Sequence, residues 1–229
     1  MRSIDILLPL LLASAVPTAA PLLWVEPLPS TGSPVAAGPL QAGSVTGIVR
    51  IGDEPTADVV VYLEAEETSR EAPPAPERTP PVIDQTHLEF LPDVAVVRPG
   101  MSVDFLNSDG ILHNVFSPGW SGEEFDLGTY PSGATRSHTF TEPGPHVILC
   151  KVHPEMVAYV VVVDTPYFAV SDSAGRFSIG AVSPGRYRLT VWRRGGEERR
   201  TDLVVPPNGM TGLTVDVSDP GRLLSIRTP

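Results

Sequence analysis

The chain has 229 residues, enough for one large domain or two small ones, and 41% of them are apolar, which supports packed cores. The formal net charge of −11 argues against a nucleic-acid partner, because phosphate binding needs clustered Lys and Arg. The 20 Gly and 26 Pro residues favour β-rich domains with many turns, and the single cysteine excludes an internal disulfide.

The N-terminal segment carries a short apolar run at residues 6–12, followed by Ala13-Ser14-Ala15. Such a run is too short to cross a bilayer comfortably and is typical of a secretory signal peptide. We therefore expect residues 1–20 to be a signal peptide, with cleavage after Ala15, and the protein to be periplasmic or extracellular. An uncleaved membrane anchor is the alternative, and only then would the chain contact the membrane.

The region before residue 82 contains two linkers and one group of strand signals. Residues 21–43 are rich in Pro, Ala, Gly and Ser, which predicts a linker. Residues 44–66 predict two strands, at 46–51 and 58–63, with a turn between them. Residues 67–81 are charged and Pro-rich, so we expect an exposed connector there.

The segment 82–164 has strand signals in close order, and no part of it shows a long 3.6-residue period. We expect strands at residues 87–90, 94–97, 101–105, 136–140, 146–150 and 157–163, from alternation or from short apolar runs ended by turns. Met101, Val103 and Phe105 should face a core. The stretch 118–133 is expected to be an excursion between strands, with Glu123-Glu124 as solvated charge. This pattern is typical of a β-sandwich.

The last segment, 167–217, repeats the strand-and-turn pattern. We expect strands at residues 169–171, 176–179, 186–192, 203–205 and 213–217. The tail at residues 218–229 has no clear pattern. The predicted fold class is therefore all-β, with two small β-sandwiches and no long helix.

The single cysteine lies in a constellation of metal-ligand side chains. Cys150, His153 and Met156 lie within seven residues, and His113 lies 37 residues upstream of the cysteine. One thiolate, two imidazoles and one thioether are the ligand set of a type 1 (blue) copper site, with N, N and S in a trigonal plane and a long axial thioether contact. Copper is therefore the predicted cofactor.

Other interpretations of these residue types are weaker. A lone buried cysteine is usually an inert small apolar group. A Cys–His pair can also act as nucleophile and base, but no orienting acid or oxyanion site accompanies Cys150 and His153. We therefore do not expect an enzyme. His87, His138 and His146 lie in strand-like runs without metal spacing, which predicts ordinary sheet residues.

The segment 82–164 resembles a cupredoxin of the amicyanin and plastocyanin type. The resemblance is carried by the Cys-x2-His-x2-Met loop from Cys150 to Met156, which is similar to the short ligand loop of amicyanin, and by Asn114 directly after His113. It implies a Greek-key β-sandwich. It also implies three equatorial copper ligands and one axial ligand, and these are His113, Cys150, His153 and Met156.

The same resemblance implies that Asn114 ties the histidine strand to the cysteine loop. One departure from the family lies at Glu155, between the loop His and Met, where an apolar docking surface is expected. Docking to an amicyanin-type partner therefore does not follow from the resemblance.

The segments on either side resemble a carboxypeptidase-regulatory-like module, a small transthyretin-like β-sandwich. Residues 47–63 resemble its opening half, whereas Asp172-x-x-Gly-x-Phe and Pro184-Gly-x-Tyr-x-Leu resemble its second half. We therefore hypothesise that the cupredoxin segment is inserted in a loop of this second sandwich, because insertion is tolerated at exposed loops. In the rival hypothesis, 44–66 is an N-terminal extension of the cupredoxin.

The overall arrangement resembles exported proteins called methylamine-utilisation-like, from which we infer no methylamine metabolism. The leading functional hypothesis is a one-electron carrier in the bacterial cell envelope, cycling between Cu(II) and Cu(I). It would exchange electrons with redox partner proteins and use no small-molecule substrate. We expect the edge of His153 to be the electron route, with Pro118, Trp120 and Pro154 in an apolar docking patch around it.

The rival function is a non-redox envelope binding or scaffold module, whose copper site serves storage or sensing or is vestigial. A copper enzyme such as a nitrite reductase or oxidase is less expected, because the chain lacks a second His-rich cluster for further copper centres.

Overall fold

The computed structural model describes residues 42–66, 79–195, 198–218 and 225–227, all within one compact unit at 38–229. The predicted signal peptide, nearly all of the linker at 21–43 and most of the connector at 67–81 lie outside these residues. Every regular element in the described residues is a strand, so the predicted all-β class is confirmed. Among the same residues, no helix is long and apolar enough to cross a bilayer.

The middle of the chain forms one sandwich of two sheets. Its strands are β4 (Val82–Thr86), β5 (Glu89–Leu91), β6 (Val94–Val97), β7 (Met101–Asn107), β8 (His113–Pro118), β9 (Glu124–Tyr130), β10 (Thr135–Phe140), β11 (Gly144–Leu149) and β12 (Val157–Val162). One sheet has the order β10-β7-β4-β5 and the other β6-β12-β11-β8-β9. A shared core joins them, since Phe105 on β7 and Ile148 on β11 are fully buried in one cluster.

This sandwich differs from the prediction in two ways. Strands β4, β8 and β9 occupy residues that lie outside the predicted strand ranges. The alternation at His87–Phe90 predicted a strand, but His87 and Leu88 form the turn between β4 and β5. Their φ angles of 55° and 63° are left-handed, so the chain reverses where sequence alternation alone favours extension.

The remaining strands form a second pair of sheets. They are β1 (Gly43–Ile51), β2 (Glu54–Pro55), β3 (Val60–Ala65), β13 (Phe168–Val170), β14 (Arg176–Val182), β15 (Gly185–Trp192), β16 (Arg199–Val205), β17 (Met210–Asp216) and β18 (Ser225–Arg227). The orders are β14-β1-β17-β18, with β2 on β1, and β13-β3-β15-β16. The tail was expected to lack structure, but β18 pairs with β17.

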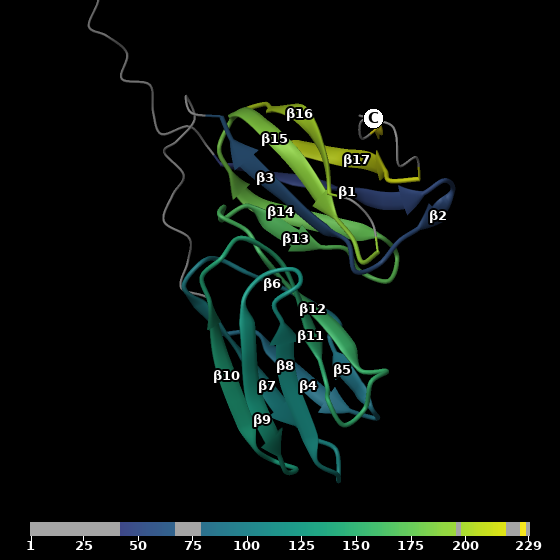
Figure 1. Cartoon of the computed structure of the whole chain (residues 1–229). Helices are drawn as coiled ribbons and strands as arrows, with labels where there is room; N and C mark the ends of the chain where they lie inside the picture. The colour runs from purple at the N-terminus through teal and green to yellow at the C-terminus, as the bar shows by residue number, and fades with distance from the viewer. Residues whose placement is uncertain (1–41, 67–78, 196–197, 219–224, 228–229) are drawn as a thin grey trace, which may run out of the picture. The chain divides into compact units, whose positions relative to one another are not determined.

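Strands from the two ends of the chain share these sheets. Strand β1 lies between β14 and β17, and Figure 1 shows dark-blue β1 beside yellow β17. Strand β3 pairs with β13 and β15 in the same way. A single buried cluster includes Val49 of β1, Leu63 of β3 and Leu189 of β15. Residues 43–65 therefore take their neighbouring strands from residues 168–216 and share a buried core with them, whereas Val60 and Tyr62 on β3 belong to another buried cluster that includes Val94 and Val161.

The strand ends of the first sandwich bring distant residues to one edge. Strands β8 and β11 are antiparallel neighbours, with Leu149 opposite Phe116. Because the strands are antiparallel, the start of β8 at His113 lies at the same edge as the end of β11, directly before Cys150. Strand β12 starts directly after Met156. The loop 150–156 therefore lies beside the first residue of β8.

Candidate metal centre

Three of the predicted ligands come together at this edge. The Nδ1 atoms of His113 and His153 are 3.0 Å apart. The Sγ atom of Cys150 is 3.8 Å from the first and 3.9 Å from the second. His113 and Cys150 are buried, whereas His153 is partly exposed. Among the described residues, these three form a group that could hold a metal ion.

The separations fit an ion held between the three atoms. Typical bond lengths to a bound transition-metal ion such as Zn²⁺ are about 2.0 Å for an imidazole nitrogen and about 2.3 Å for a thiolate. With angles of about 120°, these lengths place two nitrogens roughly 3.5 Å apart and a nitrogen and a sulfur roughly 3.7 Å apart. The observed values of 3.0, 3.8 and 3.9 Å are close to both. Imidazole and thiolate together are a donor set suited to copper.

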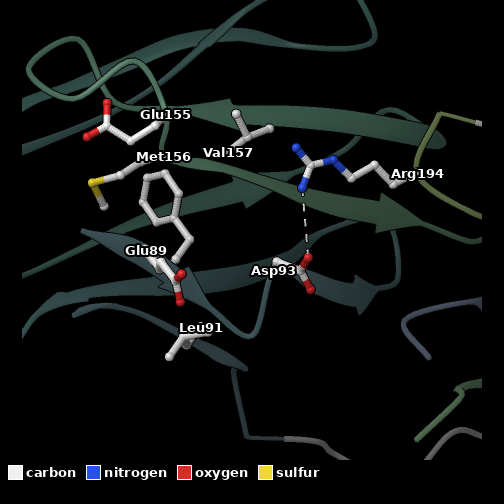
Figure 2. Close-up of a pocket in the computed structure, with 8 residues that line it drawn as sticks. Glu89, Leu91, Asp93, Glu155, Met156, Val157 and Arg194 are labelled. Carbon is white, nitrogen blue, oxygen red and sulfur yellow. Dashed lines mark ion pairs between the residues drawn. The ribbon is translucent and has the colours of Figure 1, made fainter. Parts of the chain in front are cut away.

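Met156 lies at the same end of the sandwich. Its side chain is 1% exposed and belongs to the same buried cluster as that of Cys150. Its N–H donates to the carbonyl of His153 at 3.0 Å, which closes the loop as a turn. Met156 also lines a pocket of about 230 Å³, with Glu89, Leu91 and Glu155 among its other walls (Figure 2).

The Cys150 sulfur is tied to β8 through Asn114, as the resemblance implied. The Asn114 N–H lies 3.4 Å from Sγ, and the Asn114 side-chain oxygen accepts a hydrogen bond from the Lys151 N–H at 3.3 Å. The Asn114 amide then donates to Asp126 at 2.8 Å, and Lys151 Nζ reaches the other Asp126 oxygen at 2.6 Å. These contacts hold the residues on either side of the thiol.

Asp126 stays ionised under ordinary conditions. The hydrogen bond from Lys151, followed by those from the Gly128 N–H and Asn114, lowers the pKa of Asp126 to about 2. This role was not predicted, because Asp126 lies in the stretch that was expected to be an excursion. The role is visible in the structure, where Asp126 on β9 accepts a hydrogen bond from Asn114 on the neighbouring strand β8.

His113 has a second partner behind its ring. Its Nε2 atom lies 2.8 Å from Asp109 Oδ2, so its Nδ1 atom is the one that faces Cys150 and His153. Burial raises the pKa of Asp109, but hydrogen bonds from the Leu88 N–H, from His113 and from the His87 N–H outweigh burial and lower it. The sequence identified Asp109 only as a turn residue.

Two other histidines lie in the same sandwich but away from this group. His146, fully buried on β11, accepts a hydrogen bond from the Glu123 N–H at 3.0 Å and contacts the Glu142 carbonyl at 2.8 Å. His138 contacts the Glu123 carboxylate at 2.9 Å and stacks on Phe125. Both are sheet residues, as predicted, whereas His87 lies in a turn.

Glu123 is not the simple solvated charge that was predicted. Its carboxylate accepts hydrogen bonds from the N–H and hydroxyl of Thr141 and from the Glu142 N–H, besides the contact to His138. Burial acts to raise its pKa, but these hydrogen bonds outweigh burial and lower the pKa of Glu123 to about 2. Glu124 is exposed, as expected.

The exposed apolar residues near the ligands are not all those that were predicted. Ile111 and Leu112 directly precede His113, Val152 directly precedes His153, and all three are about half exposed. Pro118 and Trp120 were expected beside His153. Pro118 ends β8, five residues or roughly 16 Å along the strand from His113, and Trp120 follows it. The predicted patch is therefore wrong in these two members.

Comparisons with known proteins give partial matches. The family model described as "Polysaccharide lyase family 4, domain II" matches residues 162–213. No curated protein sequence matches the chain. The resemblance of the flanking segments to a carboxypeptidase-regulatory-like module therefore stays a prediction.

Solved structures similar to the chain include cupredoxins. An oxidised proline-to-alanine variant of amicyanin is 28% identical, covering 39% of this chain and 89% of that one, with a TM-score of 0.35. A purple cupredoxin from Nitrosopumilus maritimus is 23% identical, covering 36% and 99%, with a TM-score of 0.33. The copper-containing nitrite reductase of Thermus scotoductus SA-01 is 26% identical, with a TM-score of 0.37, and the match covers 39% of this chain but only 23% of that enzyme. All three TM-scores are below 0.5, so the assignment of the site rests on the geometry above.

Proposed function

We propose that the chain is an exported type 1 copper protein that carries single electrons between redox partner proteins in the bacterial cell envelope. The observation that carries this proposal is the convergence of His113 Nδ1, Cys150 Sγ and His153 Nδ1 at separations of 3.0 to 3.9 Å. Met156, buried in the same cluster as Cys150, would complete the ligand set of a blue-copper centre.

The chain's own residues would hold the ligands in one arrangement. Asp109 fixes the ring of His113, and the Asn114 N–H fixes the sulfur of Cys150. Copper held by His113, Cys150, His153 and Met156 would supply a one-electron Cu(II)/Cu(I) couple for exchange between a donor and an acceptor protein. Ligands that are already fixed need little rearrangement between the two oxidation states, which suits rapid electron transfer.

The edge of His153 is the proposed route for electrons. His153 is the only member of the three-residue group with partial exposure in the described structure, since His113 and Cys150 are buried. Leu112, Val152 and Pro154 are exposed neighbours of the two histidines in the chain, and they give a partner an apolar surface to contact. The net charge of −11 favours association with a basic partner.

The proposal also covers location and chemistry. The apolar run near the N-terminus supports export to the periplasm or beyond. We assign the chain no catalytic role and no small-molecule substrate. The alternative, a non-redox binding or scaffold module, draws support from the second pair of sheets, which has its own buried core and the family match at residues 162–213.

The first test is a titration of the protein lacking residues 1–20 with Cu(II), followed by visible absorption. We expect an intense blue thiolate-to-copper band that is lost in Cys150→Ser. His146→Gln is the matched control, because both nitrogens of His146 already have backbone partners, and it should keep the band. A colourless wild-type protein would refute the blue-copper assignment.

Electrochemistry then separates the two functions. Reversible and fast reduction of the bound copper supports the carrier. Copper that binds but is not reduced and reoxidised quickly would contradict the carrier and favour the binding module.

A further inference from the structure

The Nε2 atom of the buried His113 ring points away from the metal group and toward a single carboxylate, that of Asp109. We propose that Asp109 is a positioning residue, which fixes the ring of His113 for metal binding and ties that ring to the exposed turn at His87 and Leu88. The part of this inference that concerns copper rests on the proposed function, whereas the part that concerns the ring itself applies to the metal-free protein.

The contacts of Asp109 determine which nitrogen of His113 carries the hydrogen. Asp109 Oδ1 accepts the His87 N–H at 2.7 Å, and Oδ2 accepts the Leu88 N–H at 3.1 Å. A carboxylate that accepts two backbone N–H groups acts as an acceptor toward His113 as well, so His113 Nε2 must donate across the 2.8 Å contact. In the neutral ring, Nδ1 then keeps its lone pair toward Cys150 and His153.

His113 has no other way to hold this orientation. Its side chain is 0% exposed, so water does not reach the ring, and a flip of the ring about the Cβ–Cγ bond would turn Cδ2–H toward the sulfur and the other imidazole and take Nε2 away from Asp109. Asp109 is itself anchored, because its N–H lies 3.0 Å from Asn107 Oδ1 and 3.1 Å from the Gln85 carbonyl. The carboxylate is therefore a fixed reference for the ring.

The same carboxylate stabilises an unusual turn. His87 and Leu88, with φ angles of 55° and 63°, connect β4 to β5, whose residues Thr86 and Glu89 are paired. Two-residue hairpin turns with both φ angles positive strongly prefer Asn-Gly, and a left-handed φ angle is unfavourable for most other residues. The two N–H groups bound by Asp109 offset part of that cost.

This arrangement links the surface to the buried ligand. Leu88 is 40% exposed, and its N–H shares Asp109 Oδ2 with His113 Nε2. A partner that contacts Leu88 therefore lies one hydrogen bond from the carboxylate and two from a metal ligand. The negative charge of Asp109, which lies 2.8 Å from His113 Nε2, would also favour bound Cu(II) over Cu(I), because a fixed negative charge attracts the more positive ion more strongly.

The first test uses the metal-free protein and needs no copper. Long-range proton–nitrogen NMR on the His113 ring should show hydrogen on Nε2 alone in the wild type and a mixture of the two tautomers in Asp109→Ala. Unchanged tautomers in a folded Asp109→Ala would overturn the proposal. If the wild type binds no copper but shows this loss of tautomer order, the positioning role stands and only the copper function fails.

The second test measures copper in the loaded protein. Loss of a partner behind a metal-ligating histidine typically lowers metal affinity by about 10- to 100-fold, and we expect Asp109→Ala to fall in that range. Asp109→Asn removes the charge and should lower the preference for Cu(II) over Cu(I) about tenfold, which raises the reduction potential by about 59 mV. A loaded wild type and Asp109→Asn with equal potentials would contradict the electrostatic part.

A control variant separates positioning from simple stability. His87→Asn with Leu88→Gly builds the preferred turn sequence, which needs less help from Asp109. Added to Asp109→Ala, this pair of changes should recover the Tm but not the His113 tautomer or the copper affinity. Recovery of all three would show that Asp109 acts only by stabilising the turn, and the proposal would be wrong.

Discussion

Two histidine clusters lie in the same sandwich, and they differ in whether a buried ring nitrogen is left available to bind a metal. In the cluster of His138, His146 and Glu123, both nitrogens of the buried His146 already contact backbone groups. In the cluster of His113 and His153, one nitrogen of His113 contacts Asp109, and the other faces a thiol and a second imidazole.

The difference shows what makes a histidine a candidate ligand. Burial does not decide it, since His113 and His146 are both 0% exposed. The decisive feature is a ring nitrogen that makes no hydrogen bond to a carboxylate or backbone group and that faces other side chains able to bind a metal. The first cluster is therefore structural and the second is suited to a metal.

The largest effect is expected when each of the two buried histidines, His113 and His146, is replaced by Gln in turn. His113→Gln should lose the blue band and lower copper affinity by more than the roughly 10- to 100-fold that an outer partner costs. His146→Gln should keep copper affinity within about tenfold and lower the free energy of unfolding by about 1–3 kcal/mol, because buried partners lose their hydrogen bonds. Copper titration and urea unfolding measure both, and the reverse pattern would contradict the assignment of the two clusters.

A second test addresses the packing of the structural cluster. Gly122 has a φ angle of +138°, and a Cβ there would lie 2.2 Å from His146 Nδ1. We expect Gly122→Ala to lower the free energy of unfolding by about 2–3 kcal/mol, through backbone strain and displacement of the ring. Gly133→Ala is the control, because its φ of +77° is also left-handed but no atom lies within 4 Å of the added Cβ.

The Gly133→Ala change should cost only about 1 kcal/mol, since it has the backbone term alone. Denaturant unfolding of the two variants measures the difference between them. Equal losses would mean that the contact between Gly122 and His146 adds nothing to stability.

A third test concerns the cluster of His113 and His153 and asks whether Met156 contacts the bound metal. Met156→Gln replaces a soft thioether with a harder amide oxygen, which favours Cu(II). We expect copper to stay bound and the reduction potential to fall by about 59 mV, which corresponds to a tenfold change in relative affinity for the two oxidation states. Voltammetry of the loaded protein measures this shift. A potential that does not change would mean that Met156 does not contact the bound metal.

The smallest expected effect concerns acid stability. The pKa of Glu123 is lowered from its ordinary value of 4.5 to about 2, so its contribution to stability is present above pH 4.5 and is lost as the pH falls toward 2. Between about pH 5 and about pH 2.5, the metal-free wild type should therefore lose more unfolding free energy than Glu123→Gln does.

Glu124→Gln is the matched control for charge, because it removes the same charge from the exposed neighbour. Its acid unfolding curve should follow that of the wild type. The hydrogen bonds of Glu123 would be irrelevant to acid stability if the two variants behaved alike.

The sequence predicted much of the sandwich and missed specific parts of it. Strands with clear alternation, such as residues 101–105, lie within β7, as predicted. Strand β9 was missed because all but one of its residues are exposed or partly exposed, and because its pairing with β8 is set by contacts rather than by a local pattern. The turn at His87 and Leu88 was missed because the pair is not an Asn-Gly or Asp-Gly turn signal, and because the stabilising Asp109 lies 22 and 21 positions away.

The residue order alone predicts the donor set, because Cys150, His153 and Met156 share one short loop between two apolar runs and need no distant contact to lie close together. Folding brings His113, one of the four other histidines, beside this loop and determines what supports the ligands. His146 is occupied by Glu123, 23 residues away, and Asn114 is held by Asp126 on the neighbouring strand. A histidine ring nitrogen makes its hydrogen bond, and the other ring nitrogen stays available to a metal, only when folding has brought the partner within about 3 Å. No local pattern of residues encodes that distance.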